Sequence, residues 1–214
     1  VNAIAKGRGR FKAVAAMSTI PDGTCSYAAL VARKGLCTGG LLSRETLAGK
    51  KFEMPPAGMR QYFLDSWLGS FGLGTEDIQT TYLPKPVVGE ALAKGSLDFS
   101  ILSEPWLSRV LQAGQAEIVS SFESILPNSQ FAVILFGPTL LADRPKVGRG
   151  FLVAYLQGVR QYLQGKSERN LVILSGHTGM EKAFLRTVCL PGIPADGQII
   201  FKSVEDFQDW ALKK

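Results

Sequence analysis

Between Lys51 and Ser120, short apolar segments alternate with helix-like segments, and this alternation restricts the fold more than any other feature of the sequence. Several of the apolar segments lack a clean period-two pattern, which is typical of strands covered on both faces. Such alternation favours a parallel sheet with helices on both faces, so the sequence predicts the α/β class. The predicted strands are Lys12–Met17, Tyr27–Arg33, Lys51–Met54, Ile78–Leu83, Leu97–Leu102, Glu117–Ser120 and Phe131–Phe136.

The helical segments are recognised by apolar residues at helical spacing. Met59 and Phe63, for example, are four residues apart and share one face of a helix. After the last predicted strand the pattern is helical, with no internal repeat or long linker. The predicted helices are Gly58–Gly69, Pro86–Lys94, Pro105–Gln112, Arg149–Gln164, about Thr178–Val188, and Ser203–Lys213, where Ser203 and Asp206 resemble a capping box.

The composition is that of a globular protein. The chain is 46% hydrophobic and 20% charged, which excludes disorder, and no apolar run approaches the ~18 residues that span a bilayer. The net charge of +6 is spread along the chain apart from a basic run at 6–12, which is more typical of a solvated face than of a phosphate-binding site. We therefore expect no nucleic-acid partner, and a small anionic partner is compatible with the charge.

Few residues could carry catalysis or bind a metal. The cysteines are Cys25, Cys37 and Cys189, the one histidine is His177, and no four of the side chains have convincing zinc-ligand spacing. His177 lies in a turn-like stretch, and no G-x-S-x-G motif is present. We expect no metal, no cofactor and no enzymatic activity. A Cys25–Cys37 bridge could form in an oxidising compartment, although nothing local requires it.

Six short stretches follow one another as they do in a known family. GEALAKGSLDFSIL at 89–102 is similar to "EALKSGQVDAAVL", and EPW at 104–106 is similar to the "EPF" that follows it. The other stretches lie at 1–15, 47–52, 141–145 and 151–159. The chain thus resembles ABC-transporter solute-binding proteins of the sulfonate, nitrate and taurine group, which includes thiamine-precursor-binding relatives.

The resemblance implies a two-lobed periplasmic-binding-protein-like fold with parallel-type sheets flanked by helices. Residues 1–48 would form a partial lobe 1 with the outgoing crossover strand, 49–130 lobe 2, and 131–214 the return crossover and the C-terminal helices of lobe 1. Family members usually begin with further strands, so the first lobe is expected to be incomplete. Its apolar sheet edge would be exposed. Either the sequence is truncated, or a homodimer partner or a second chain would complete the lobe.

The family also implies a function. The chain would be the extracytoplasmic solute-binding component of an ABC importer, periplasmic or, in a full-length form, lipid-anchored. It would capture a small organic solute (a sulfonate, or a taurine-like, aromatic or pyrimidine-like compound) in an interlobe cleft and deliver it to a membrane permease. The alternatives are a ligand-sensing domain of a regulator and a relative of the thiamine-pyrimidine enzymes. The enzyme requires clustered histidine and cysteine, which this sequence lacks.

In such a fold, loops at the carboxyl ends of the strands face the cleft. Gly58 and Met59 begin a predicted helix, where free backbone N–H groups would hold an anion, and Arg60 would add a charge-assisted contact. The alternative is an ordinary helix start with a solvent-facing arginine. Asn128 and Ser129, before the return crossover, would orient the solute, or would form an ordinary Pro-Asn turn.

A second group of candidates surrounds the strand that ends near Leu102. Glu104 would accept hydrogen bonds from a ligand amine or ring N–H, and Trp106 would stack on a planar or cationic ligand. The alternatives are a helix-start glutamate and a core tryptophan. Ser26 and Tyr27 begin the outgoing crossover and would line the same cleft. Together with Met59, these side chains favour a solute with an apolar or aromatic body.

Overall fold

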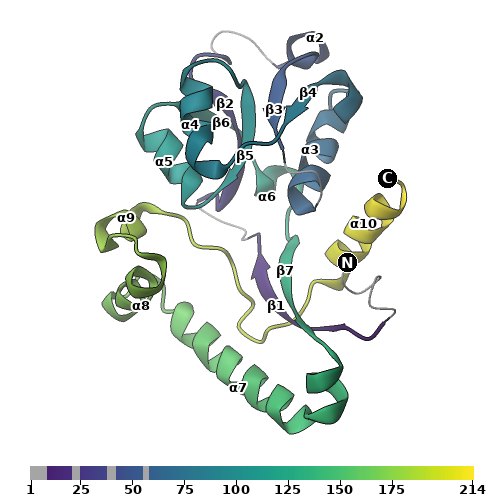
Figure 1. The fold of residues 1–214 in the computed structure, drawn as a ribbon, viewed down its shortest axis with the longest axis vertical. Helices are drawn as coiled ribbons and strands as arrows, with labels where there is room; N and C mark the ends of the chain where they lie inside the picture. The colour runs from purple at the N-terminus through teal and green to yellow at the C-terminus, as the bar shows by residue number, and fades with distance from the viewer. Residues whose placement is uncertain (1–8, 21–24, 38–41, 55–57) are drawn as a thin grey trace. The chain divides into compact units, whose positions relative to one another are not determined.

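The computed structural model describes residues 9–20, 25–37, 42–54 and 58–214 (Figure 1). Contacts divide the chain into two units. Unit 1 comprises Val1–Pro21, Asn128–Thr187 and Pro191–Lys214, and unit 2 comprises Asp22–Pro127 and Val188–Leu190. Residues 1–8 lie outside the described residues, so only parts of the basic run at 6–12 and of the resembling stretch at 1–15 are described. Residues 25–37, which were predicted with the first lobe, lie in unit 2.

Both units contain strands and helices, as the α/β prediction requires. The strands are β1 (Lys12–Thr19), β2 (Ala28–Arg33), β3 (Lys51–Glu53), β4 (Gln79–Thr81), β5 (Phe99–Ser103), β6 (Ala116–Ser121) and β7 (Gln130–Phe136). The helices are α2 (Arg44–Leu47), α3 (Met59–Gly69), α4 (Lys85–Ala93), α5 (Trp106–Gln112), α6 (Phe122–Ile125), α7 (Pro145–Tyr162), α8 (Glu168–Thr178), α9 (Lys182–Thr187) and α10 (Phe201–Leu212), with shorter helical turns η1 (Thr75–Asp77) and η2 (Thr139–Asp143).

The sheet of unit 2 has the strand order β4-β3-β5-β2-β6. β3 is parallel to β4 and β5, whereas β2 is antiparallel to both β5 and β6. The strands of the alternating region therefore run in one direction, as predicted, and β2 runs in the other. The prediction of parallel strands covered only the alternating region and is confirmed there; β2 precedes that region and is not joined to it by a helical crossover of the parallel type.

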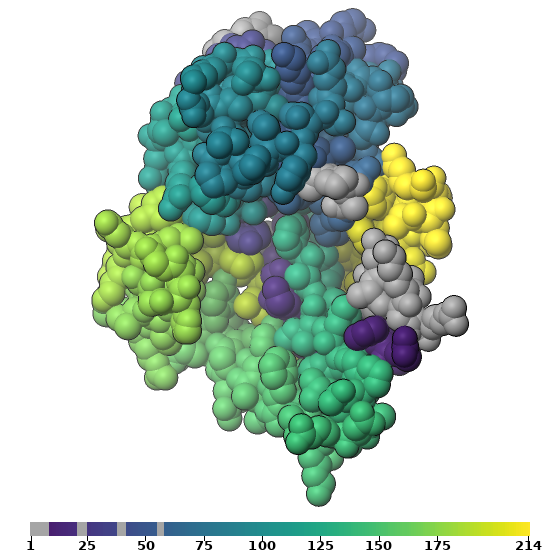
Figure 2. All heavy atoms as spheres, viewed as in Figure 1, coloured from purple at the N-terminus to yellow at the C-terminus, as the bar shows by residue number. Residues whose placement is uncertain are grey.

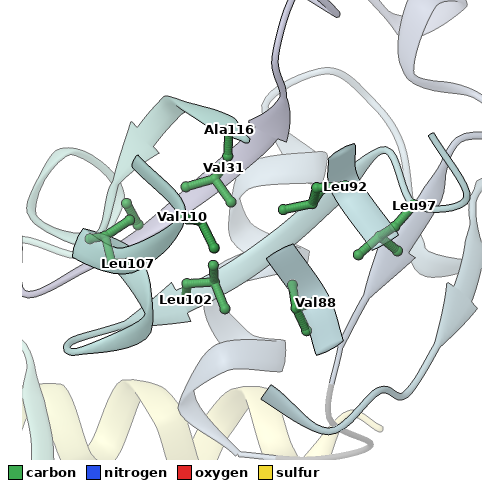
Figure 3. Packing of buried hydrophobic residues seen from close by; sticks show 9 residues of the cluster. Val31, Val88, Leu92, Leu97, Leu102, Leu107, Val110 and Ala116 are labelled. Atoms are coloured by element: carbon green, nitrogen blue, oxygen red, sulfur yellow. The ribbon is translucent and has the colours of Figure 1, made fainter. Parts of the chain in front are cut away.

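Helices α4 and α5 pack on one face of this sheet. Leu102 of β5 and Val31 of β2 contact Val88 of α4 and Val110 of α5 in a fully apolar cluster (Figure 3). Successive side chains of a strand point to opposite faces, so Phe99 and its neighbours of the same parity face α3. There the Phe99 ring stacks on Phe52 at 4.5 Å between centroids. The core of unit 2 thus lies on both faces of its sheet.

Unit 1 has a two-stranded antiparallel sheet formed by β1 and β7. The far edge of β1 is met by the C-terminal segment, since Ala16 N donates to Gly197 O at 2.8 Å and Thr19 N to Gly192 O at 2.7 Å. Helix α7 is attached to the same strand by Tyr155, whose hydroxyl donates to Ala16 O at 2.6 Å. β1 and the C-terminal segment are therefore joined within this unit.

Much apolar surface of unit 1 is exposed. Helix α7 buries only Gly148 and Val159, and Phe151 and Val153 are exposed. In helix α10, Phe201 is 69% exposed and Leu212 is 77% exposed. Figure 2 shows the green atoms of α7 and the yellow atoms of α10 at the surface. These exposed apolar residues lie on helices, and the exposed sheet edge expected of the first lobe stays a prediction.

Two local predictions are wrong, and one further helix is shorter than predicted. Helix α8 was not expected, and His177 lies in its last turn, not in a loop. Its start is capped by Ser167, whose side chain accepts from Asn170 N. The helix expected at about 178–188 is the shorter α9. Ser203 caps no helix, because α10 begins earlier and the Ser203 hydroxyl accepts from Gln130 N at 2.9 Å.

The disulfide is not the Cys25–Cys37 bridge that the sequence left open. Cys25 is bonded to Cys189, and Cys37 is free. The two bonded residues are 164 apart in sequence but both belong to unit 2. The bridge depends on a long-range contact, so local spacing could not predict it. Among the described residues, no helix is long and apolar enough to cross a membrane.

Candidate functional site

Three glutamates lie at the carboxyl ends of three strands of the unit 2 sheet, β3, β5 and β6. Glu53 is the last residue of β3, Glu104 follows β5, and Glu123 lies in α6, directly after β6. Because these strands run in one direction, their carboxyl ends meet at one edge of the sheet. The antiparallel β2 begins at the same edge, where Ala28 pairs with Ser103. We call the three residues Glu53, Glu104 and Glu123 the carboxylate edge.

Glu53 is completely buried and forms an ion pair. Its Oε2 accepts from Lys85 Nζ at 2.6 Å and from Ser100 Oγ at 2.8 Å, and its side chain is 0% exposed. Its other oxygen, Oε1, has no hydrogen-bond partner among the described residues. Burial of a carboxylate is unfavourable without a compensating partner, which here is Lys85. Sequence reasoning missed this pair, since Glu53 looked like a strand residue and Lys85 like a residue before a helix.

Burial lowers the pKa of Lys85 below its usual 10.5. The hydrogen bond and charge of Glu53 oppose this shift, and the nearby charge of Arg60 adds to it. The charge of Arg60 thus acts on Lys85, whose own charge is paired with that of Glu53.

Glu104 is held by three donors. Its Oε1 accepts from Ser108 Oγ at 2.8 Å and from Cys189 N at 3.0 Å, and its Oε2 accepts from Ser108 N at 3.1 Å. Its backbone N donates to Tyr27 O at 2.9 Å. The carboxylate therefore caps the start of α5, which is the structural role weighed against ligand binding in the sequence analysis. A carboxylate has further acceptor positions, so ligand binding by Glu104 stays a prediction.

Glu123 was not predicted as a site residue. Its Oε1 accepts from Ser26 Oγ at 2.7 Å, and its buried Oε2 has no hydrogen-bond partner among the described residues. The only sequence signal was its position just after a strand. Tyr27 follows Ser26 in the chain. Burial raises the pKa of the Tyr27 hydroxyl, and the charge of Glu104 raises this pKa further. A hydrogen bond with Ser103 lowers it and so opposes both effects.

The predicted anion site falls at the start of α3. Gly58 is the residue before the helix, with φ of 99°, a backbone conformation that glycine adopts readily, and Met59 is the first helical residue. Both residues, like Arg60, are partly buried. Residues 55–57 lie outside the described residues. Anion binding at this helix start stays a prediction.

Trp106 packs in unit 2, in agreement with the alternative of a core tryptophan. It lies against the apolar cluster of Figure 3, and the guanidinium carbon of Arg109 is 4.9 Å from the centre of its ring. The cation over this ring is thus supplied by the protein. Stacking of a solute on Trp106 stays a prediction.

Asn128 and Ser129 belong to unit 1. Asn128 is exposed and has φ of 51°, a left-handed conformation frequent in turns. Ser129 is buried, and its carbonyl accepts from Ile20 N at 2.9 Å. These features fit the turn that the sequence analysis offered as the alternative. Their grouping with the residues of unit 2 stays a prediction.

The edge as a whole is suited to binding polar groups. It holds carboxylate oxygens, hydroxyls and the Lys85 ammonium in positions set by hydrogen bonds, and fixed polar groups of both signs orient a small ligand. In the described part of the chain, no group of three or more His, Cys, Asp or Glu residues could hold a metal ion.

Comparison with known proteins agrees with this architecture. Residues 26–173 match the model of the NMT1-like family. No curated protein matches the chain.

Several solved structures are similar to the whole chain. The ligand-binding component of an ABC-type import system from Staphylococcus aureus, with zinc bound, has a TM-score of 0.75 at 13% identity, over 98% of this chain and 69% of that one. The aliphatic sulphonate binding protein SsuA of Escherichia coli has 0.72 at 16% identity, with coverage of 98% and 69%. The alkanesulfonate-binding protein SsuA of Xanthomonas axonopodis pv. citri, bound to MOPS, has 0.73 at 18% identity, with coverage of 98% and 70%. At such identities the likeness shows the fold alone, and it confirms the periplasmic-binding-protein-like fold.

Proposed function

Because the chain belongs to the NMT1-like family, we propose that it is the solute-binding component of an ABC-type importer. It captures a small organic solute outside the cytoplasm and delivers it to a membrane permease. The fold supports this role, since it is shared with binding components of import systems. The interlobe cleft, the lipid anchor and the homodimer remain predictions from the sequence.

The observation that carries the proposal is the carboxylate edge, where Lys85 is paired with Glu53 and the charge of Arg60 acts on Lys85. Glu104 follows β5, the neighbour of β3, and Glu123 follows β6, which is separated from β5 by β2. A solute with an anionic group and N–H donors would meet groups of both signs at this edge. A taurine-like compound or a base with an acidic substituent fits this pattern better than bare nitrate does.

The proposed contacts come from both the sequence and the structure. In unit 2 the sequence supplied Tyr27, Gly58, Met59, Arg60, Glu104 and Trp106, and the structure adds Lys85 and Glu123. Asn128 and Ser129 of unit 1 remain predictions from the sequence. The role of the proposed contacts is to hold and orient the solute. No chemical step is assigned to them.

A thermal melt against a panel of solutes tests the proposal. The panel contains taurine, hexanesulfonate, MOPS, a pyrimidine base and nitrate. A solute present at about 100 times its dissociation constant stabilises the folded chain by about 2.7 kcal/mol, a shift of several degrees. We expect such a shift with an organic member and none with nitrate. A cooperative melt that no organic solute moves would contradict the proposal.

A further inference from the structure

Three consecutive residues before β2 connect three separate parts of unit 2. Cys25 is disulfide-bonded to Cys189, and the Ser26 hydroxyl donates to Glu123 Oε1 at 2.7 Å. The Tyr27 carbonyl accepts from Glu104 N at 2.9 Å. Ser26 and Tyr27 thus form hydrogen bonds with two of the three glutamates of the carboxylate edge, Glu123 and Glu104.

The disulfide fixes a short segment that returns to unit 2 from far along the chain. Val188–Leu190 is the part of the chain after Pro127 that groups with unit 2. Cys189 N donates to Glu104 Oε1 at 3.0 Å, the same oxygen that accepts from Ser108 Oγ. One carboxylate oxygen is therefore held between α5 and the returning segment. The disulfide closes this arrangement covalently.

We propose that Cys25 and Cys189 are positioning residues for the solute site. Their disulfide holds the Cys189 amide on Glu104, so the carboxylate is fixed before the solute arrives. Prior ordering of a binding group reduces the entropy lost on binding and so raises affinity. Reduction of the disulfide releases the amide, loosens Glu104 and weakens solute binding. This inference rests on the proposed function, because it assigns Glu104 to the solute site.

The two residues of the bridge differ in exposure, and we expect attack at the more exposed one. Cys25 is exposed, whereas Cys189 is 5% exposed. A thiolate of a dithiol reductant attacks the Cys25 sulfur, and Cys189 leaves as a thiolate that takes up a proton. The second thiolate of the reductant then displaces Cys25, which also takes up a proton. Two electrons pass to the protein, and the dithiol becomes a cyclic disulfide.

Amide hydrogen exchange tests the positioning directly. Exchange at Cys189 is measured in the oxidised chain, after dithiothreitol, and after reoxidation. We expect reduction to accelerate exchange about tenfold or more, since a hydrogen bond to a charged group is lost, and reoxidation to restore it. Cys37→Ser is the matched control, because Cys37 forms no disulfide, and it should leave the exchange rate at Cys189 unchanged. Unchanged exchange after verified reduction would overturn the inference.

A second variant guards against unfolding on reduction. Glu104→Ala leaves the disulfide intact but removes the acceptor of the Cys189 amide. In the oxidised chain it should accelerate exchange at Cys189 by a similar factor. If Cys189 stays protected in this variant, Glu104 does not hold the amide and the inference is wrong.

Titration calorimetry then connects the disulfide to binding. The panel solute with the largest melting shift is titrated into the oxidised, reduced and reoxidised chain. We expect affinity to fall about tenfold on reduction and to recover on reoxidation. Equal affinity in all three forms would overturn the inference and leave the proposed function intact. If no panel solute binds the oxidised chain, the proposed function fails and the solute-positioning role with it, while the exchange data still decide whether the disulfide fixes Glu104.

Discussion

Lys85 Nζ lies 2.6 Å from Glu53 Oε2, and this bond neutralises a carboxylate that has no exposed surface. Lys85→Met should destabilise the chain by about 3–5 kcal/mol, because the variant leaves a buried charge without its partner. Urea unfolding measures the loss. Lys94→Met is the matched control, since Lys94 pairs with Glu90 at the surface, and it should change the free energy of unfolding little.

The double variant Lys85→Met with Glu53→Gln separates charge from packing. Removal of both charges should recover most of the stability lost in the single variant. If Lys85→Met alone were as stable as the unsubstituted chain, the statement that Lys85 compensates the buried charge of Glu53 would be wrong.

Tyr27 should make stability fall at alkaline pH. Its pKa in the folded chain is raised above 10.0, first by burial and then by the charge of Glu104. As pH rises above 10.0, the unfolded chain loses this proton while the folded chain keeps it. The free energy of unfolding therefore decreases with pH until the folded pKa is passed. Tyr27→Phe should lack this part of the decrease, and parallel pH profiles of the two chains would contradict the assignment.

Loss of the Cys25–Cys189 disulfide should lower the free energy of unfolding in addition to loosening the Glu104 carboxylate. The bridge joins residues 164 apart, so its removal frees a long loop in the unfolded chain. Cys25→Ser with Cys189→Ser should lower the free energy of unfolding by about 3–5 kcal/mol. Urea unfolding under oxidising conditions measures this, and Cys37→Ser should behave like the unsubstituted chain. A double variant of unchanged stability would mean that the bridge does not form in solution.

Glu123→Gln should separate stability from binding. In this variant the side-chain amide oxygen still accepts from Ser26 Oγ. The negative charge of the carboxylate, whose buried Oε2 has no hydrogen-bond partner among the described residues, is removed. The melting temperature should not fall, and the affinity for a solute that donates N–H groups should drop about tenfold. Melting and calorimetry on one preparation give both values. An unchanged affinity would remove Glu123 from the proposed contacts.

The sequence predicted the elements of unit 2 well, because their signals are local. Each predicted strand and helix between Lys51 and Ser120 is present, with bounds that differ by a few residues. What depends on distant contacts was not predicted. The direction of β2, the partner of Cys25 and the capping of α8 by Ser167 are examples.

The candidate site shows the same limit. The Glu-Pro-Trp stretch located Glu104 after β5, but not the donors that occupy its oxygens, since Ser108 and Cys189 come from two separate elements. Lys85 and Glu53 are 32 residues apart, and only the parallel pairing of β3 with its neighbours brings them together. Local pattern carries no information about such a pair.

The central claim is that this chain binds a small organic solute at the carboxylate edge of unit 2. Titration calorimetry with the panel solute that gives the largest melting shift tests it most directly, on the unsubstituted chain, Glu104→Gln and Glu90→Gln. Glu90 is the control, because it is exposed on α4 and pairs only with Lys94 in the described structure. We predict one-to-one binding that weakens about tenfold in Glu104→Gln and is unchanged in Glu90→Gln. Equal affinity in all three chains, or no heat of binding with any organic solute, would contradict the claim.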